Sequence, residues 1–145
     1  MKIGSKGIAL IQAFEKCRLK AFLPTPEDKW TIGWGHTKGV AEGDTCTNEE
    51  ADAWFLEDIA WVEACVNRSV TAHLLQDEFD ALASLCYNIG CPQFSSSTLV
   101  KQINENNFDA AAKSFMLWNK QHGEVIAGLT NRRAKEAQLF ETANA

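Results

Sequence analysis

Two stretches of the sequence, EKCRLKAF at residues 15–22 and WTIGWGHT at residues 30–37, decide the fold that we predict. In the first stretch, Glu15 is a lone acid that closes a helix-like segment, which Ser5 can cap at its start. In the second, β-branched and aromatic residues alternate with glycines, which is typical of a short strand followed by a turn. This strand carries the hydroxyl group of Thr31. A helix-terminal acid followed by a strand hydroxyl indicates a candidate acid/base site.

The rest of the chain predicts one small sheet and several helices. Pro24 and Pro26 exclude a helix after the first stretch, so we expect a small sheet over about residues 22–46. Thr47 and Glu50 form a capping box that opens a long helix. Apolar periodicity then predicts further helices at about residues 75–89, 95–104, 108–120 and 130–141. This order is typical of an α+β fold with a small sheet lobe, a connecting helix and a larger helical lobe.

Length and charge restrict the classes of function. A chain of 145 residues that is 46% hydrophobic and has five tryptophans can form one domain with a substantial core. The formal net charge of -5 gives no electrostatic support to a nucleic-acid partner, which usually requires a basic face. A local basic cluster does occur in the last third, at Arg132, Arg133 and Lys135.

Cysteine usage favours reduced thiols. The five cysteines are an odd number and include no CxxC pair, which disfavours both a disulfide framework and a zinc site. Cys86 and Cys91 are five residues apart and could pair if the protein reached an oxidising space, but we expect them to stay reduced.

The apolar residues near the start of the chain predict an amphipathic helix. The apolar run at residues 8–14 is far shorter than the roughly 20 residues that a membrane span requires. We therefore expect no stable membrane insertion, and a protein that works outside the cytoplasm would need another protein to let it through.

The histidines predict a structural role and no metal site. His73 and His122 are too distant in sequence from His36 to suggest a set of metal ligands. We predict instead that His36 pairs with an acid of the helix that begins near Thr47, with Asp58 as the first candidate.

Three motifs in this order resemble the phage-type lysozymes, the endolysins of glycoside hydrolase family 24. They are TIGWGHT at residues 31–37, ALASLCYNIG at residues 81–90 and GLTNRRAKE at residues 128–136, and the resemblance extends from about Ser5 to Phe140. It implies a lysozyme-like α+β fold and no metal or organic cofactor.

The resemblance also implies how the domain is organised. It predicts a single lysozyme-like domain over residues 1–145, in which the sheet lobe covers about residues 18–46 and the helical lobe about residues 67–145. The N-terminal helix is expected to pack on the helical lobe, and a cleft is expected between the lobes.

The motifs assign expected roles to four residues. Glycoside hydrolysis needs an acid that protonates the leaving oxygen, and the resemblance gives this role to Glu15. It implies that Thr31 helps to hold the attacking water and that Asn88 points its amide at the glycan. Arg133 is expected to approach Glu15, where it would either hold the acid in place or bind substrate carboxylates.

The second carboxylate of the family pattern is absent at its usual spacing. In the pattern, eight residues separate the glutamate from an aspartate and five residues separate the aspartate from the threonine. Counting forward from the acid reaches Pro24, and counting back from the strand threonine reaches Thr25. Thr25 can occupy the place of the aspartate, Asp28 or Glu27 can swing in, or the acid and the strand threonine can suffice. We favour Thr25 from the sequence.

The resemblance predicts an endolysin that lyses the host cell. It would hydrolyse, with inversion, the β-1,4 bond between N-acetylmuramic acid and N-acetylglucosamine in peptidoglycan. We expect a monomer that waits in the host cytoplasm, is released with the help of a holin and acts on the periplasmic cell wall. Two alternatives are a lytic transglycosylase, which leaves a 1,6-anhydro end, and a non-catalytic wall-binding module.

Overall fold

The computed structural model describes residues 1–143 and divides the chain into two compact units. The sheet unit comprises Ile11–Trp61, and the helical unit comprises Met1–Leu10 together with the chain from Val62 onward. Helices α1 and α2 each contribute residues to both units.

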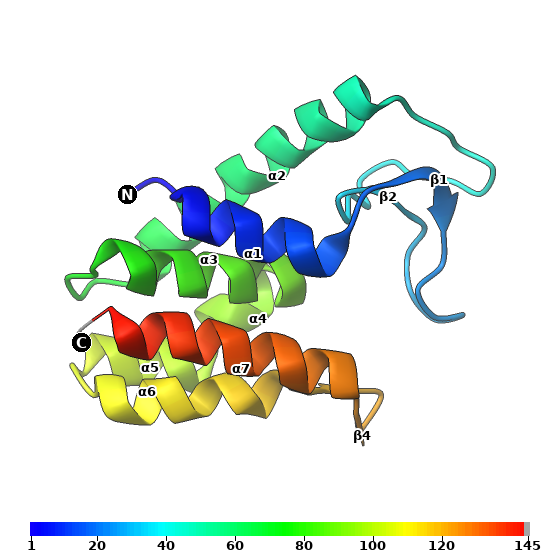
Figure 1. The fold of residues 1–145 in the computed structure, drawn as a ribbon. Helices are drawn as coiled ribbons and strands as arrows, with labels where there is room; N and C mark the ends of the chain where they lie inside the picture. Colours follow the sequence, from blue (N-terminus) through cyan, green and yellow to red (C-terminus); the bar gives the residue numbers. More distant parts are fainter. Residues whose placement is uncertain (144–145) are drawn as a thin grey trace. The chain divides into compact units, whose positions relative to one another are not determined.

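Helices dominate the described residues, and the strands are short (Figure 1). The helices are α1 (Ser5–Glu15), α2 (Asn48–Ser69), α3 (Gln76–Ile89), α4 (Cys91–Ser95), α5 (Thr98–Asn104), α6 (Phe108–Ser114), the 3₁₀-helix η1 (Phe115–Trp118) and α7 (Ala127–Thr142). The strands are β1 (Arg18–Phe22), β2 (Thr31–Gly33), β3 (Lys120–Gln121) and β4 (Glu124–Val125). The predicted α+β class is confirmed.

In the sheet unit, β1 and β2 form an irregular antiparallel pair. Arg18 lies opposite Gly33 and Phe22 lies opposite Thr31, so the register shifts between these two pairs. The sheet begins earlier than residue 22, and β2 ends at Gly33 because the backbone there takes a positive φ of 64°. The Ile32 N–H and C=O groups then bond to the backbone of His36 and close a turn, at 2.9 and 2.8 Å.

The start of α2 confirms the predicted capping box. The Glu50 N–H donates to Thr47 Oγ1 at 3.1 Å, and the Thr47 N–H donates to Glu50 Oε1 at 3.0 Å. These two bonds satisfy amide groups that have no partner within the first turn of the helix. One face of the helix then buries Phe55 and Ile59 in the sheet unit.

The start of α1 is capped from another helix, and the prediction that Ser5 is the cap is wrong. Ser5 is the first residue of α1 and is exposed. The buried Asp80 of α3 accepts hydrogen bonds from the Gly4 N–H at 2.8 Å and from the Gly7 N–H at 3.1 Å. A carboxylate at the positive end of a helix dipole is favourable, so α3 defines where α1 begins.

The core of the helical unit is built around α3, in which every residue from Glu78 to Tyr87 is buried. Helix α7 packs along α3, and α6 and η1 also contact α7 (Figure 1). The helix predicted at residues 95–104 is α5, which begins later, at Thr98, because Ser97 caps it by accepting from the Val100 N–H at 3.2 Å. The helix predicted at residues 108–120 ends in η1 and the β3–β4 hairpin.

The expectation of reduced cysteines is only partly met. Cys65 of α2 and Cys91 of α4 form a disulfide, whereas Cys86, the partner that we considered for Cys91, is a buried free thiol. Gly90 takes a φ of 88° and turns the chain at the end of α3, so Cys91 does not continue the helix that carries Cys86. Cys17 and Cys46 are free and half-buried.

The close approach of α1 to α3 gives a first prediction, for the variant Gly7→Ala. The added Cβ would lie 2.7 Å from Ile3 Cγ1 and 2.9 Å from Asp80 Cβ, closer than real Cβ contacts. Alanine favours a helix by about 1 kcal/mol over glycine. Overpacking costs about 1–3 kcal/mol, so we expect a net decrease in the free energy of unfolding.

Urea denaturation measures this effect, and Gly128→Ala in α7 is the matched control. No atom lies within 4 Å of a Cβ built at Gly128, so this variant should be neutral or more stable by up to about 1 kcal/mol. Equal effects of the two substitutions would contradict the role that we give to the contact at Gly7.

Candidate active site

Glu15 is the last residue of α1, and its side chain is half-buried. The helix ends there because Lys16 adopts a left-handed conformation, with φ 56°. The Lys16 N–H still donates to the Gln12 carbonyl at 3.0 Å, and β1 begins two residues later at Arg18. Only two residues separate the end of α1 from the first strand, so Glu15 lies immediately before the β1–β2 hairpin in the sequence.

Thr31, the first residue of β2, belongs to the same sheet unit as Glu15. Its side chain is only 8% exposed, and its hydroxyl donates to the Lys29 carbonyl at 2.9 Å. A hydroxyl group has one hydrogen and two acceptor positions. The Thr31 oxygen can therefore accept a hydrogen bond from a water molecule while its own hydrogen is held by the backbone.

The structure brings together two of the three candidates for the second catalytic group. Thr25 and Asp28 both lie in the loop between β1 and β2 and are both half-buried. The Thr25 hydroxyl donates to Asp28 Oδ2 at 2.9 Å, and the Asp28 N–H donates to the Thr25 carbonyl at 3.0 Å. The neighbouring Glu27 is exposed. Thr25 therefore orients the carboxylate of Asp28.

The other two predicted residues, Asn88 and Arg133, lie in the helical unit and bond to each other. Arg133 is fully buried and donates from Nη2 to Asn88 Oδ1 at 2.9 Å. It also donates from Nη1 to the Trp118 carbonyl at 3.3 Å. Asn88 is exposed at the last turn of α3, so a buried arginine holds the amide of an exposed side chain.

Beneath this pair lies a buried ionic network that we did not predict. Glu136 Oε1 lies 2.7 Å from Arg133 Nε, and Glu136 Oε2 lies 3.3 Å from Arg132 Nε. The Ser84 hydroxyl also donates to Glu136. Burial raises the pKa of Glu136, and the charges of Arg133 and Arg132 act in the opposite direction. The spacing of the two arginines and the acid along one helix was the available sequence signal.

His36 has the partner that we predicted. Its Nδ1 lies 2.9 Å from Asp58 Oδ2, and Asp58 Oδ1 accepts from the Trp61 indole N–H at 3.1 Å. The imidazole is buried and stacks on Trp54, with 5.0 Å between the ring centroids. This arrangement ties the turn after β2 to α2 within the sheet unit.

Residues 1–143 contain neither a candidate metal site nor a candidate membrane span. No cluster of three or more His, Cys, Asp or Glu side chains in this part of the chain is placed to hold a metal ion. No helix among these residues has the length and apolar character needed to cross a lipid bilayer.

Comparison with known sequences identifies relatives over nearly the whole chain. A sequence model of the family described as "Phage lysozyme" matches residues 12–136. The endolysin of Acyrthosiphon pisum secondary endosymbiont phage 1 is 41% identical, over 99% of this chain and 100% of that protein. The endolysin of Salmonella phage P22 is 40% identical, over 97% of this chain and 98% of that protein.

Solved structures agree with the sequence comparison. The muramidase domain of SpmX from Asticaccaulis excentricus superposes with a TM-score of 0.86 at 38% identity, covering 96% of this chain and 97% of that domain. A mutant of P22 lysozyme superposes with a TM-score of 0.80 at 38% identity, covering 97% of this chain and 99% of the other. The chain therefore belongs to the phage lysozyme family.

Proposed function

We propose that this chain is an endolysin that hydrolyses the β-1,4 bond between N-acetylmuramic acid and N-acetylglucosamine in peptidoglycan, with Glu15 as the general acid. Membership of the phage lysozyme family supports glycoside hydrolysis, and the endolysins and the muramidase domain among its relatives support peptidoglycan as the substrate. One observation carries the residue assignment. Glu15 ends α1 directly before the hairpin that holds Thr25, Asp28 and Thr31, all within the sheet unit.

In the proposed reaction, Glu15 gives its proton to the glycosidic oxygen as the bond to that oxygen breaks. Positive charge develops on the sugar ring in the transition state, so a negative group on the water side lowers the barrier. A water molecule then attacks the anomeric carbon from the opposite face, which inverts its configuration.

We propose Asp28 as the water-side carboxylate and Thr25 as its positioning residue. The Thr25 hydrogen is donated to Asp28, so the charge and the proton-accepting capacity of this pair reside on Asp28. The Thr31 hydroxyl, whose hydrogen is held by the Lys29 carbonyl, would accept a hydrogen bond from the same water. From the sequence we favoured Thr25 as the second catalytic group. We now prefer Asp28, because the hydroxyl of Thr25 is bonded to Asp28 and can act only by positioning its carboxylate.

Substitution of this pair should separate the two roles. We expect Asp28→Asn to lower the rate of peptidoglycan hydrolysis by roughly 10²–10⁴-fold, because general-base catalysis is lost. Thr25→Ala should cost less, about tenfold to a hundredfold, because a hydrogen bond to a charged carboxylate contributes about 1.5–3 kcal/mol. Turbidity loss of a peptidoglycan suspension, with purified variants at equal concentration, measures both rates.

Glu27→Gln is the control for this pair, because it removes a neighbouring exposed carboxylate, and little change is expected. A large loss in Thr25→Ala with near-normal activity in Asp28→Asn would show that Thr25 itself holds the water.

Product analysis tests the proposed reaction. Purified peptidoglycan is digested with the protein, and the soluble fragments are identified by mass spectrometry. Fragments with a reducing N-acetylmuramic acid end support hydrolysis of the proposed bond. Fragments with a 1,6-anhydro end would identify a lytic transglycosylase, and intact glycan would favour a wall-binding module without catalysis.

We further propose that the protein is a monomer that leaves the host cytoplasm through a holin and acts on the periplasmic wall. The apolar residues near the start of the chain support only the need for a holin, because they belong to α1 and Ile11 is fully buried by the fold. Expression in bacteria with and without a holin tests the release step. Lysis without a holin would contradict it, and light scattering after size exclusion measures the oligomeric state.

A further inference from the structure

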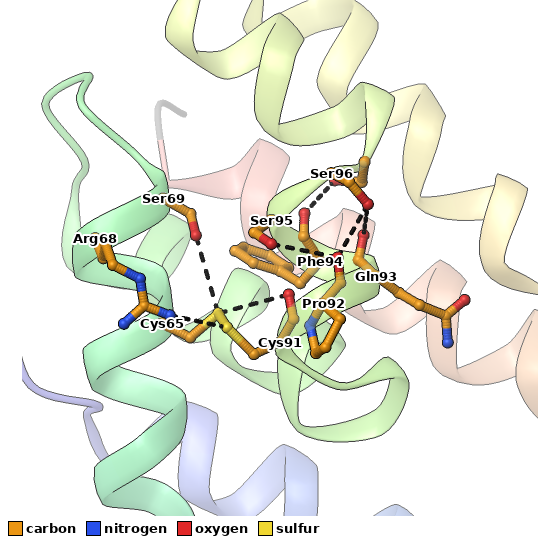
Figure 2. The surroundings of a disulfide bond; sticks show 10 residues. Cys65, Arg68, Ser69, Cys91, Pro92, Gln93, Phe94, Ser95 and Ser96 are labelled. Carbon is orange, nitrogen blue, oxygen red and sulfur yellow. Dashed lines mark hydrogen bonds between the residues drawn. A yellow bond between two sulfur atoms is a disulfide. The ribbon is translucent and has the colours of Figure 1, made fainter.

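The C-terminal end of α2 carries a sulfur site that the glycosidase reaction does not use (Figure 2). The two sulfurs of the Cys65–Cys91 disulfide have different surroundings. Cys65 is 1% exposed, whereas Cys91 is half-buried. The exposed Arg68 donates from Nη2 to Cys91 Sγ at 3.2 Å. Solvent and a cation therefore both reach the Cys91 side of the bond.

The attacking group in thiol–disulfide exchange is a thiolate, and the Arg68 guanidinium beside Cys91 Sγ attracts this anion. The same cation attracts anionic reagents to the disulfide. Cys65 is nearly inaccessible, and the polar groups near its sulfur are neutral: the Cys91 carbonyl at 3.8 Å and the Ser69 hydroxyl at 3.9 Å. An incoming thiol would therefore attack the sulfur of Cys91. The sulfur of Cys65 would be released and could later attack Cys91 to restore the disulfide.

The third cysteine of the helical unit does not compete for this bond. Cys86 is fully buried, and burial raises the pKa of its thiol to about 12 although Arg68 acts to lower it. The thiolate of Cys86 is therefore nearly absent at neutral pH, and an attacking thiol must come from solvent.

A polar cavity of about 440 Å³ lies one residue from the bond, on the far side of Ser69, and offers room for the body of such a thiol. Ser69 lies beside the Cys65 sulfur and also lines the cavity. The other lining residues include one cation, Lys101, and one acid, Glu105, and the hydroxyl-bearing residues Ser95, Ser96, Ser97 and Thr98. Hydroxyl groups and a lysine suit the amides and carboxylates of a small peptide better than an apolar ligand.

We propose that the Cys65–Cys91 disulfide is a reversible exchange site at which Cys91 forms a mixed disulfide with a small, anionic, peptide-like thiol. The incoming thiolate attacks Cys91 Sγ, the bond between the two cysteines breaks, and Cys65 leaves as a thiolate and takes a proton. The number of disulfides does not change in this step. In the reverse step, the Cys65 thiolate attacks Cys91 Sγ and expels the small thiol. The site is independent of the proposed glycosidase function.

Intact-mass and peptide-mass analysis with glutathione tests the proposal. The Cys17→Ser/Cys46→Ser background removes the two half-buried free thiols. We expect one glutathione adduct on Cys91 after brief exposure of the oxidised protein. In Arg68→Gln the rate of adduct formation should fall by about tenfold, because the local positive field at the bond is lost. Arg68→Lys should retain most of the rate, and added salt should lower it.

Cysteamine, a cationic thiol of smaller size, provides the comparison reagent. Its rate should not fall in Arg68→Gln, because the arginine repels it. An adduct on Cys65 or Cys86, or equal glutathione rates in the parent and Arg68→Gln proteins, would overturn the proposal. Thermal denaturation of each variant verifies that it is folded, so that a slow rate reports the chemistry of the site.

Discussion

Replacing Glu15 with glutamine should lower the rate of peptidoglycan hydrolysis by at least roughly 10²–10⁴-fold. Glutamine has nearly the same shape as glutamate and has no acidic proton to give to the leaving oxygen. The substitution therefore removes general-acid catalysis while keeping the packing at the end of α1. The midpoint of thermal unfolding should change little, because the side chain is only half-buried.

The rate loss is measured by turbidity and by the yield of reducing ends from purified peptidoglycan. Glu42→Gln is the matched control, because Glu42 is an exposed acid of the same unit and the substitution removes the same charge. Glu15→Asp should retain partial activity, since it keeps an acid on a shorter side chain. A Glu15→Gln protein with near-normal hydrolysis would refute the assignment of the general acid.

Replacing Glu136 with leucine should lower the free energy of unfolding by about 3–5 kcal/mol. The side chain of Glu136 is fully buried, and it compensates two buried arginines, Arg132 and Arg133. Removing the carboxylate leaves two guanidinium groups in an interior of low dielectric constant without their counter-charge. The loss of a partner in a buried pair costs far more than the net contribution of the intact pair, because the desolvation of the remaining charge is no longer offset.

Glu136→Gln should be intermediate, because the amide oxygen can still accept hydrogen bonds from the arginines and from Ser84. Glu141→Gln is the control on the same helix, and since Glu141 is exposed its effect should stay within about 0.5 kcal/mol. Urea unfolding followed by circular dichroism measures the three variants. A leucine variant as stable as the parent would show that the arginines need no counter-charge at this position.

These two experiments distinguish an effect on catalysis from an effect on stability. Glu15→Gln should abolish hydrolysis in a stable protein, whereas Glu136→Leu should destabilise a protein whose catalytic groups are unchanged. Loss of Glu136 also removes a partner of Arg133, which holds Asn88. Reduced hydrolysis by Glu136→Gln at a temperature where the variant is fully folded would indicate that the position of Asn88 matters for substrate binding.

Features set by short-range interactions were predictable from the sequence. The capping box of Thr47 and Glu50 depends on residues three apart, and the structure forms it as predicted. The α+β class follows from local periodicity and from the prolines and glycines that interrupt it. The pairing of His36 with Asp58 was also predicted, although these residues are 22 apart and α2 carries several other acids.

Features that join distant parts of the chain were decided by the tertiary structure. The cap of α1 comes from Asp80, 76 residues from Gly4, and the disulfide joins cysteines 26 residues apart. The bond between Thr25 and Asp28 spans only three residues, but it depends on how the loop after Pro24 turns. Helix and strand periods encode which face of an element is buried, and they do not encode which distant side chain meets it. Those pairs of side chains are determined only when the whole chain has folded and packed.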